Sequence, residues 1–272
     1  MDNSANQILQ LILQKYHMNL LAYDEDYLMK TIHKRMAFLQ YKSFDEYLLE
    51  ITYNQGEVHT LSDALNINYS QFFREQQGFF ALEQVVMPSL FSQNKNNREI
   101  RIWSVGCSTG QEAYSVAILL HHYSVLTGKK FRYRIFASDI SISSLEYAKR
   151  GIYNEHEVES IRYEFIKKYF VKIENTYHIL QEIKDHITFL EYDLLDTKTR
   201  IPTESIYGEF DIVLCNNILY YYRDEFQKII INKLVKSLSP IGFLITTKSE
   251  KMIVSKNVEL KNINVESSVF RK

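Results

Sequence analysis

The first third of the chain carries hydrophobic residues at the spacing of amphipathic helices. The two clearest sets are Ile8, Leu9, Leu11, Ile12 and Tyr27, Leu28, Ile32, Met36, Leu39. Residues at this spacing share one face of a helix. Ser43, followed three residues later by Glu46, has the signature of a capping box that opens a further helix. The pattern predicts an all-helical N-terminal domain over residues 1–92.

The polar stretch 93–98, QNKNNR, predicts a linker, and beyond it short apolar runs alternate with longer helical stretches. The expected strands are 100–105, 133–138, 187–191, 210–215 and 242–247, with 265–270 as a last edge strand. Helices are expected over 111–126, 143–150 and 225–238. This alternation predicts an α/β domain over residues 93–272, with a mostly parallel, doubly wound sheet and helices on both faces. Ligands of such sheets bind beyond the carboxyl ends of the strands.

Composition and charge narrow the class of protein. The 272 residues are 46% hydrophobic and 24% charged, which is typical of a globular protein, and the net charge is −1. No global positive field favours nucleic acid. We expect a cytoplasmic protein, because the N-terminus does not resemble a signal peptide and no apolar run reaches the roughly 18 residues of a membrane helix. Cys107 and Cys215 make no disulfide framework. The eight histidines are scattered, so no metal site is expected.

Four segments at the expected strand ends carry candidate chemistry. The first is a glycine turn, Gly106 to Gly110, between a strand and a helix. Its glycines let the backbone approach a ligand closely, although an ordinary tight turn is an equal alternative. It follows neither the dinucleotide nor the P-loop pattern. Asp139 ends the next strand, where an acid accepts hydrogen bonds from a ribose or caps a helix. Asp193 follows the third strand and could accept from an adenine amino group.

The fourth segment is FDIVLCNNILYYY, residues 210–222, a buried strand that runs into polar and aromatic residues. With WSVGCSTGQEAYSVA (103–117), FASDISISSLEYAKRGIY (136–153) and NYSQFFRE (68–75), the chain resembles the chemotaxis-type (CheR-type) protein-glutamate O-methyltransferases. The likeness covers roughly residues 20 to 250. It implies a Rossmann-like class I methyltransferase sheet, an N-terminal helical domain, a small inserted β-subdomain at about 152–190, and S-adenosylmethionine as cofactor.

The resemblance also implies roles for individual residues. Arg74 and Tyr221 match residues of the reaction centre and are the candidate catalytic residues. The candidate cofactor-binding residues are Asn68, Ser70, Arg74, Gly106, Glu112, Asp139, Asp193, Leu194, Cys215 and Asn216. Surface arginine and packed tyrosine remain the alternative readings of Arg74 and Tyr221.

The chain departs from the family pattern at several positions. Ser70 replaces a threonine, Gln111 a glutamate and Ala113 a proline. The largest departure is Asn216, where the family usually has arginine, so a fixed cation near the substrate carboxylate is lost. After the fifth strand only Ser249 and Glu250 of the family's G-H-S-E remain.

The implied reaction needs few groups. A glutamate side chain has a reference pKa near 4.3, so the nucleophile is ionised at neutral pH without a general base. The enzyme has to align oxygen, methyl and sulfur, which supplies roughly 7–11 kcal/mol in favourable cases. The expected partners are the cytoplasmic helices of chemoreceptors, with no nucleic acid and no membrane insertion, and the protein is expected to be a monomer.

In the family that the chain resembles, a basic N-terminal helix faces the acidic methylation helices of receptors, and a basic run on the second predicted helix matches it. This run consists of Lys30, His33, Lys34 and Arg35, and an ordinary solvated helix face remains an equal reading. Two other functions stay open: methylation of another acceptor, and a signalling module that binds the cofactor with little turnover.

Overall fold

The computed structural model describes residues 3–65, 69–93, 98–196, 198–202, 209–257, 259–263 and 267–272. The chain divides into two compact units. The first is Met1–Ile67 with Tyr220–Gln227, and the second is Asn68–Leu219 with Lys228–Lys272. Within the described ranges, no helix is long and apolar enough to cross a membrane.

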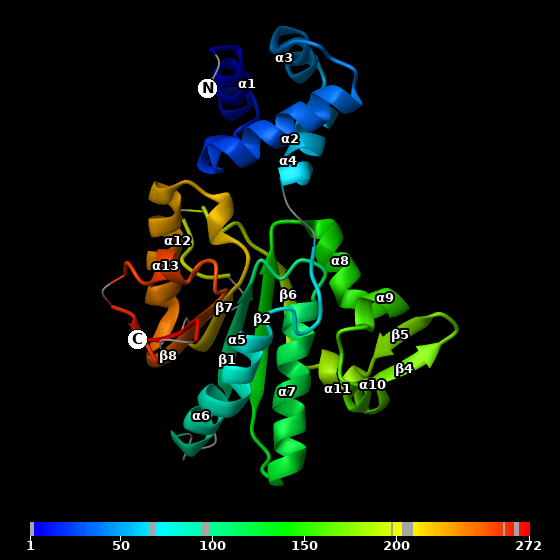
Figure 1. Ribbon diagram of the computed structural model, residues 1–272, viewed down its shortest axis with the longest axis vertical. Coiled ribbons are helices and arrows are strands. Elements are labelled where there is room, and N and C mark those ends of the chain that lie inside the picture. The colour runs from blue at the N-terminus through cyan, green and yellow to red at the C-terminus, as the bar shows by residue number, and fades with distance from the viewer. Residues whose placement is uncertain are drawn as a thin grey trace. The chain divides into compact units, whose positions relative to one another are not determined.

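The first unit is built from helices around a small apolar core (Figure 1). Its elements are α1 (Asn3–Tyr16), η1 (Leu20–Ala22), α2 (Glu25–Phe38), α3 (Phe44–Tyr53) and α4 (Gln55–Leu65). The predicted hydrophobic sets supply much of this core, with Ile8, Leu28 and Ile32 fully buried. The Ser43 hydroxyl accepts from the backbone N–H of Glu46, as the capping box predicts. The Glu46 carboxylate, however, accepts from the backbone N–H of Lys42 rather than from that of Ser43.

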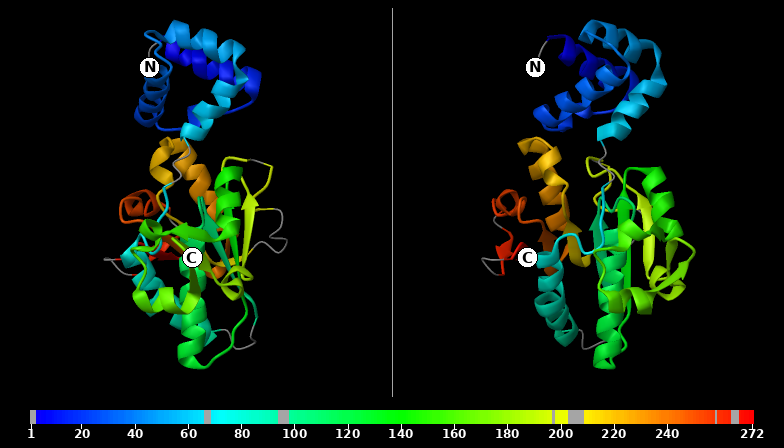
Figure 2. Two further views of the ribbon diagram at one scale, coloured as in Figure 1. Left: turned by 90° about the vertical axis from the view of Figure 1, so that its right-hand side faces the viewer. Right: turned by 45° about the vertical axis from the view of Figure 1, so that its right-hand side comes forward.

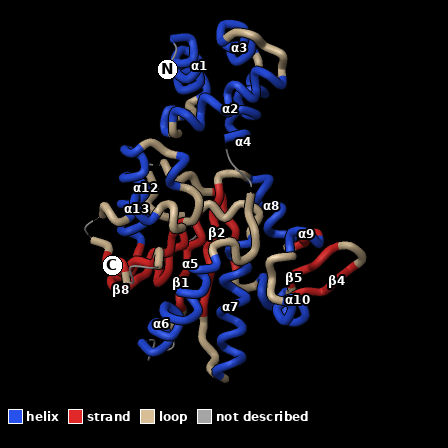
Figure 3. The backbone as a smooth tube through the Cα atoms, in the orientation of Figure 1, coloured by secondary structure: helices blue, strands red, loops and turns tan. Residues whose placement is uncertain are grey.

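The second unit is an α/β fold around a seven-stranded sheet (Figure 3). The sheet strands are β1 (Ile100–Val105), β2 (Tyr133–Asp139), β6 (Ile187–Glu191), β7 (Phe210–Cys215), β8 (Leu238–Thr246), β9 (Lys261–Asn262) and β10 (Val269–Arg271). Its helices are α5 (Gln76–Ala81), η2 (Leu82–Val86), α6 (Met87–Gln93), α7 (Gln111–Thr127), α8 (Ile142–Arg150) and α13 (Lys251–Val254). The helix α12 (Asp224–Ser237) begins in the first unit and ends in the second.

The order of the strands in the sheet is β6-β2-β1-β7-β8-β10-β9. Neighbours from β6 to β8 are parallel, and β10 is antiparallel to both β8 and β9. The predicted α/β class, with its mostly parallel doubly wound sheet, is confirmed. The last strand begins at Val269, and residues 265–266 of the expected edge strand lie outside the described residues. The chain leaves β1 in one direction and returns on the other side at β7, so the switch point of the sheet lies between these two strands.

A smaller three-stranded sheet is inserted between α8 and β6, at the right of the second unit in Figure 1. It contains β3 (Ile152–Asn154), β5 (Thr176–Ile179) and β4 (Phe170–Ile173), in that spatial order. Three short helices accompany it: α9 (Glu155–Val158), α10 (Tyr163–Tyr169) and α11 (Gln181–Lys184). The inserted β-subdomain that the sequence predicts at about 152–190 is therefore present.

The boundary between the units differs from the predicted one at residue 92. The run α5, η2 and α6 belongs to the second unit, because Phe79, Leu82 and Val86 are buried in the core that covers the sheet. Figure 2 shows this run in teal beside the sheet. Helical periodicity alone predicts a helix without saying which core it faces. Residues 94–97 of the expected linker lie outside the described residues.

Candidate active site

The glycine turn leads from β1 into α7 at the switch point. Gly106 has φ +58°, Ser108 +49° and Gly110 +91°, so three residues of this turn adopt a left-handed conformation. A Cβ on Gly106 would come within 2.7 Å of the Ile218 side chain, and one on Gly110 within 2.8 Å of Ala148 Cβ. Only glycine avoids both the conformational cost and these clashes. The turn thus needs its two glycines for its own shape.

Asp139 holds this turn from the end of β2. Its Oδ2 accepts from the backbone N–H of Ser108 at 2.7 Å, and its Oδ1 from that of Ser141 at 2.9 Å. Burial raises the pKa of Asp139, and these hydrogen bonds oppose the rise. Each carboxylate oxygen keeps a second lone pair, so Asp139 can still accept from the hydroxyl groups of a bound ribose.

Glu112 lies in the first turn of α7 and faces the end of β7. Its carboxylate accepts from the Ser104 hydroxyl at 2.6 Å and from the side-chain amide of Asn216 at 2.7 Å. Burial raises the pKa of Glu112, and neither donor is charged. The strands place these groups together, because Val105 of β1 pairs with Cys215 of β7. Glu112 and Asn216, far apart in the sequence, therefore share one edge of the sheet.

The loop after β7 is held by Glu250, a residue that the sequence analysis did not assign to the site. Its carboxylate accepts from the backbone N–H groups of Asn217, Ile218 and Leu219 at 2.9, 2.6 and 2.6 Å. It also accepts from the hydroxyl groups of Thr246 and Thr247. The side chain is fully buried. Asn217 has φ +62°, so these bonds maintain a loop that includes a left-handed residue.

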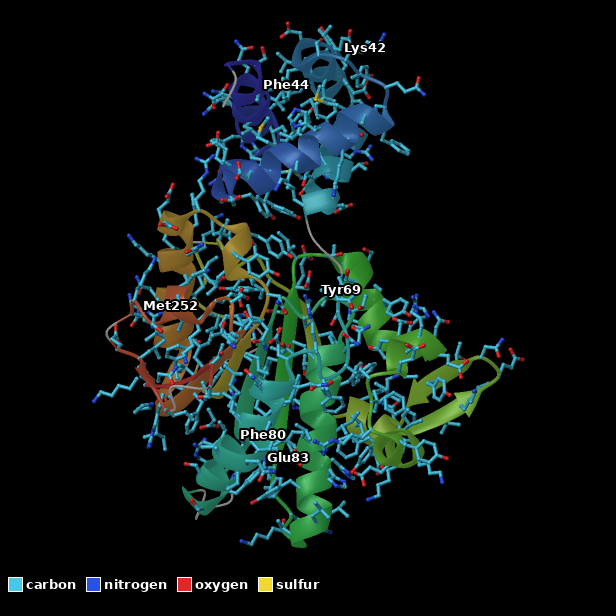
Figure 4. The ribbon with its side chains drawn as sticks, in the orientation of Figure 1. Lys42, Phe44, Tyr69, Phe80, Glu83 and Met252 are labelled. Atoms are coloured by element: carbon cyan, nitrogen blue, oxygen red, sulfur yellow. The ribbon has the colours of Figure 1, made fainter. Side chains whose placement is uncertain are left out.

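The segment before α5 carries the second group of predicted residues. Phe72 is fully buried, and the backbone N–H of Phe73 donates to the Ser115 hydroxyl of α7 at 3.0 Å. Arg74 is exposed; its guanidinium donates to the carbonyl of Tyr69 and lies 5.0 Å from the centre of that ring. Figure 4 labels Tyr69. Ser70 is half-buried, and Asn68 lies outside the described residues.

The remaining predicted residues are placed less favourably for ligand contact. Asp193 is exposed, and one of its oxygens accepts from the backbone N–H of Leu195, as in an ordinary turn. The carbonyl of the neighbouring Leu194 accepts from Lys233. The Cys215 side chain is fully buried in β7, and burial raises the pKa of its thiol. Cys107 and Cys215 are both free thiols.

Tyr221 belongs to the first unit and packs there. Its carbonyl accepts from the backbone N–H of Asp24 at 2.7 Å, and its ring lies 4.8 Å from that of Tyr27. Its hydroxyl accepts from that of Tyr220 at 3.2 Å. The same unit uses Arg35 of the predicted basic run internally, because Arg35 forms an ion pair with the buried Glu57. Only Lys30, His33 and Lys34 of that run are exposed.

The site fits a small ligand with hydroxyl and ammonium groups. Among the described residues, two buried polar atoms at this edge, Ser108 Oγ and Asn216 Oδ1, have no hydrogen-bond partner. Buried polar atoms in proteins are normally bonded, so these two are suited to contact a ligand. No cluster of metal-ligating side chains occurs in the described ranges. The strand order, the glycine turn and the acid at the end of β2 place the protein in the class of α/β proteins that bind a nucleotide-type cofactor beyond the carboxyl ends of the strands.

Comparison with known proteins identifies the family. Residues 4–65 match the family domain described as "CheR methyltransferase, all-alpha domain", and residues 68–269 match "CheR methyltransferase, SAM binding domain". The chain belongs to the CheR methyltransferase family. It is 30% identical to the chemotaxis protein methyltransferase of Salmonella typhimurium, over 92% of this chain and 84% of that protein. The corresponding protein of Borreliella burgdorferi is 27% identical, over 94% of this chain and 91% of that protein.

Proposed function

We propose that this enzyme transfers the methyl group of S-adenosylmethionine to glutamate carboxylates of chemoreceptors, in the cytoplasm. The observation that carries this is the family match across both the helical and the cofactor-binding domain. Relatives similar over nine tenths of the chain have the name chemotaxis protein methyltransferase. Methyl esters on receptor glutamates are the product that this name and the family's chemistry imply.

The chain's own residues would hold and orient the cofactor. Asp139 would accept from the ribose, and Glu112 with Asn216 would accept from the ammonium group. The bound cofactor supplies an electrophilic methyl group. Since a glutamate is ionised at neutral pH, no residue has to remove a proton. Arg74 would then orient the acceptor carboxylate, and Tyr221 keeps the role beside the methyl group that the family resemblance implies. Both assignments are proposals.

Asn216 changes the charge that is expected beside the acceptor carboxylate. The family's arginine would place a full charge beside Glu112, whereas Asn216 places an uncharged amide 2.7 Å from it. A cation that holds the acceptor carboxylate opposes its loss of charge in the transition state, so an uncharged residue here is compatible with transfer. It removes one attraction for the acceptor, which should appear as weaker binding of the protein substrate.

The test measures the transfer of a labelled methyl group from S-adenosylmethionine to membranes that contain the native receptors. The labelled membranes are then treated with alkali, which releases methyl esters. We expect base-labile label on receptor glutamates, and about 10- to 100-fold less of it in Asp139→Asn, as for the loss of a hydrogen bond to a charged group. Asp211→Asn is the matched control. Asp211 also accepts from a backbone N–H, that of Arg101, but it lies at the opposite end of its strand, where it also forms an ion pair with Arg98. Tight cofactor binding without label on any receptor would contradict the proposed acceptor and favour a cofactor-binding signalling module.

A further inference from the structure

The inserted subdomain is bonded directly to the two segments that carry the candidate site. The hydroxyl of Tyr153, in β3, donates to the carbonyl of Thr109 in the glycine turn at 2.7 Å. The Ser160 hydroxyl, after α9, donates to the carbonyl of Phe72 at 2.8 Å. The subdomain therefore bonds to backbone carbonyls of both the glycine turn and the segment before α5.

Tyr153 is held rigidly where it makes this bond. The side chain is fully buried. Its ring packs edge-on against Phe72 at 4.9 Å and against Tyr114 at 6.1 Å, and it meets Tyr147 at 5.8 Å. The four rings come from α7, α8, β3 and the segment before α5. A ring confined on all sides can aim its hydroxyl in one direction only, and a buried hydroxyl needs its partner.

The carbonyl that accepts from Tyr153 belongs to a peptide group that makes few other hydrogen bonds. The Thr109–Gly110 peptide group offers its carbonyl to Tyr153 and its N–H, at Gly110, to the Cys107 carbonyl at 2.9 Å. Gly110, at φ +91°, is the residue at which a turn changes conformation most easily. The backbone N–H of Ser108, by contrast, is held from β2 by Asp139. The Tyr153 bond is the one that reaches this peptide from the inserted subdomain.

We propose that Tyr153 is a positioning residue for the cofactor: its hydroxyl holds the Thr109–Gly110 peptide in the binding conformation and couples cofactor affinity to the inserted subdomain. The proposal rests on cofactor binding at the glycine turn and not on the identity of the methyl acceptor. A single hydrogen bond of this kind corresponds to about a 3- to 10-fold change in affinity. By linkage, a bound cofactor stabilises the subdomain by the same factor.

The structure supplies a closely matched control in Tyr114. This tyrosine is also fully buried, lies in the same cluster of rings and donates to a backbone carbonyl, that of Ala148, at 2.8 Å. That carbonyl lies in α8 and not in the glycine turn. Tyr153→Phe and Tyr114→Phe therefore remove the same chemical group from the same kind of site.

The experiment measures the affinity of the whole chain for S-adenosylhomocysteine by calorimetry, with Tm as the measure of stability. We expect similar losses of Tm in both variants, a 3- to 10-fold weaker affinity in Tyr153→Phe alone, and a higher KM for S-adenosylmethionine at unchanged kcat. Equal affinities in the two variants would overturn the proposal. If Tyr153→Phe does not fold, hydrogen exchange of the wild-type protein tests the proposal instead. We expect bound S-adenosylhomocysteine to slow amide exchange in β3 and β5. Unchanged exchange in these two strands would overturn the proposal. A wild type that does not bind would refute cofactor binding itself.

Discussion

Glu112 is a buried carboxyl group whose two hydrogen-bond donors, Ser104 and Asn216, are both uncharged. Burial raises the pKa of Glu112 above the ordinary value of a glutamate, and Glu250 and Glu75 add to the rise. A carboxyl with a raised pKa in the folded state contributes stability below its unfolded pKa and loses it as the pH rises through the folded pKa. At neutral pH and above, Glu112 therefore opposes folding of the cofactor-free protein.

The variant Glu112→Gln tests whether the ionised Glu112 lowers the stability of the cofactor-free protein. The new amide carries no charge; its oxygen can accept from the Asn216 amide and its nitrogen can donate to the Ser104 hydroxyl. We expect the Tm of cofactor-free Glu112→Gln to exceed that of the wild type by about 2–4 °C at pH 8, with the difference shrinking toward pH 5. Cofactor affinity should fall in the same variant. A Tm below that of the wild type at pH 8 would contradict the raised pKa; scanning calorimetry at the two pH values measures it.

At the scale of elements, α7 begins and ends at a left-handed glycine, and the two glycines differ in their surroundings. Gly110 at the N-terminus would bring a Cβ within 2.8 Å of Ala148 Cβ, whereas Gly128 at the C-terminus, at φ +65°, has open space around it. Both positions impose the same conformational cost on alanine, about 1 kcal/mol. Only Gly110 adds a clash and lies in the candidate site.

We therefore expect Gly128→Ala to lower the free energy of unfolding by about 1 kcal/mol and to leave cofactor affinity unchanged. Gly110→Ala should cost clearly more, since something must shift around the new methyl group, and should abolish binding of S-adenosylhomocysteine. Denaturant unfolding and calorimetry measure the two effects. Equal binding by both variants would show that the turn tolerates displacement.

The loop between β7 and α12 depends on one side chain of another element. Glu250 accepts from three successive backbone N–H groups, and glutamine can replace only one of its two oxygens as an acceptor. We expect Glu250→Gln to lower the free energy of unfolding by about 3 kcal/mol, because buried donors are left without a partner. Glu259→Gln, an exposed residue, is the control. A loss below about 0.5 kcal/mol in denaturant unfolding would refute the role.

The helices and strands could be predicted from the sequence, whereas the long-range contacts between them could not. The expected strands 100–105, 187–191 and 210–215 agree residue for residue with β1, β6 and β7, because a buried strand shows as a short apolar run. The contacts of Tyr153 and Glu250 join residues far apart in the chain, and neither has a local signature. Glu250 was noted only as a remnant of a family motif. The predicted helical domain included residues 76–92, which belong to the second unit, because an amphipathic helix does not reveal which core it faces.

At the scale of the whole molecule, charge on the first unit offers a test of receptor recognition. Lys30 and Lys34 are exposed one turn apart on α2, whereas Arg35 forms an ion pair with Glu57 and is unsuitable for charge reversal. Opposite charges on two partners act mainly on the rate of encounter, and salt screens them. The basic surface of α2 therefore consists of Lys30 and Lys34, with His33 between them in the sequence.

We expect Lys30→Glu combined with Lys34→Glu to slow receptor methylation about 10-fold at low salt, with cofactor affinity unchanged. The difference should largely disappear at about 1 M salt, where the screening length is roughly 3 Å. Lys42→Glu, an exposed lysine of the same unit labelled in Figure 4, is the control. A salt-independent loss, or an equal loss in Lys42→Glu, would refute an electrostatic contribution; initial rates on receptor membranes measure it.

The membership of residues 220–227 in the first unit bears on how such proteins can be recombined. These residues follow β7 in the chain, yet Arg223 bonds to the carbonyls of Ala22 and Tyr23, and Tyr222 stacks on Tyr23. A gene fragment that ends at residue 67 therefore encodes only part of the helical unit. An exchange of helical domains between relatives has to carry this short distal segment along, because its contacts are made with the helical unit.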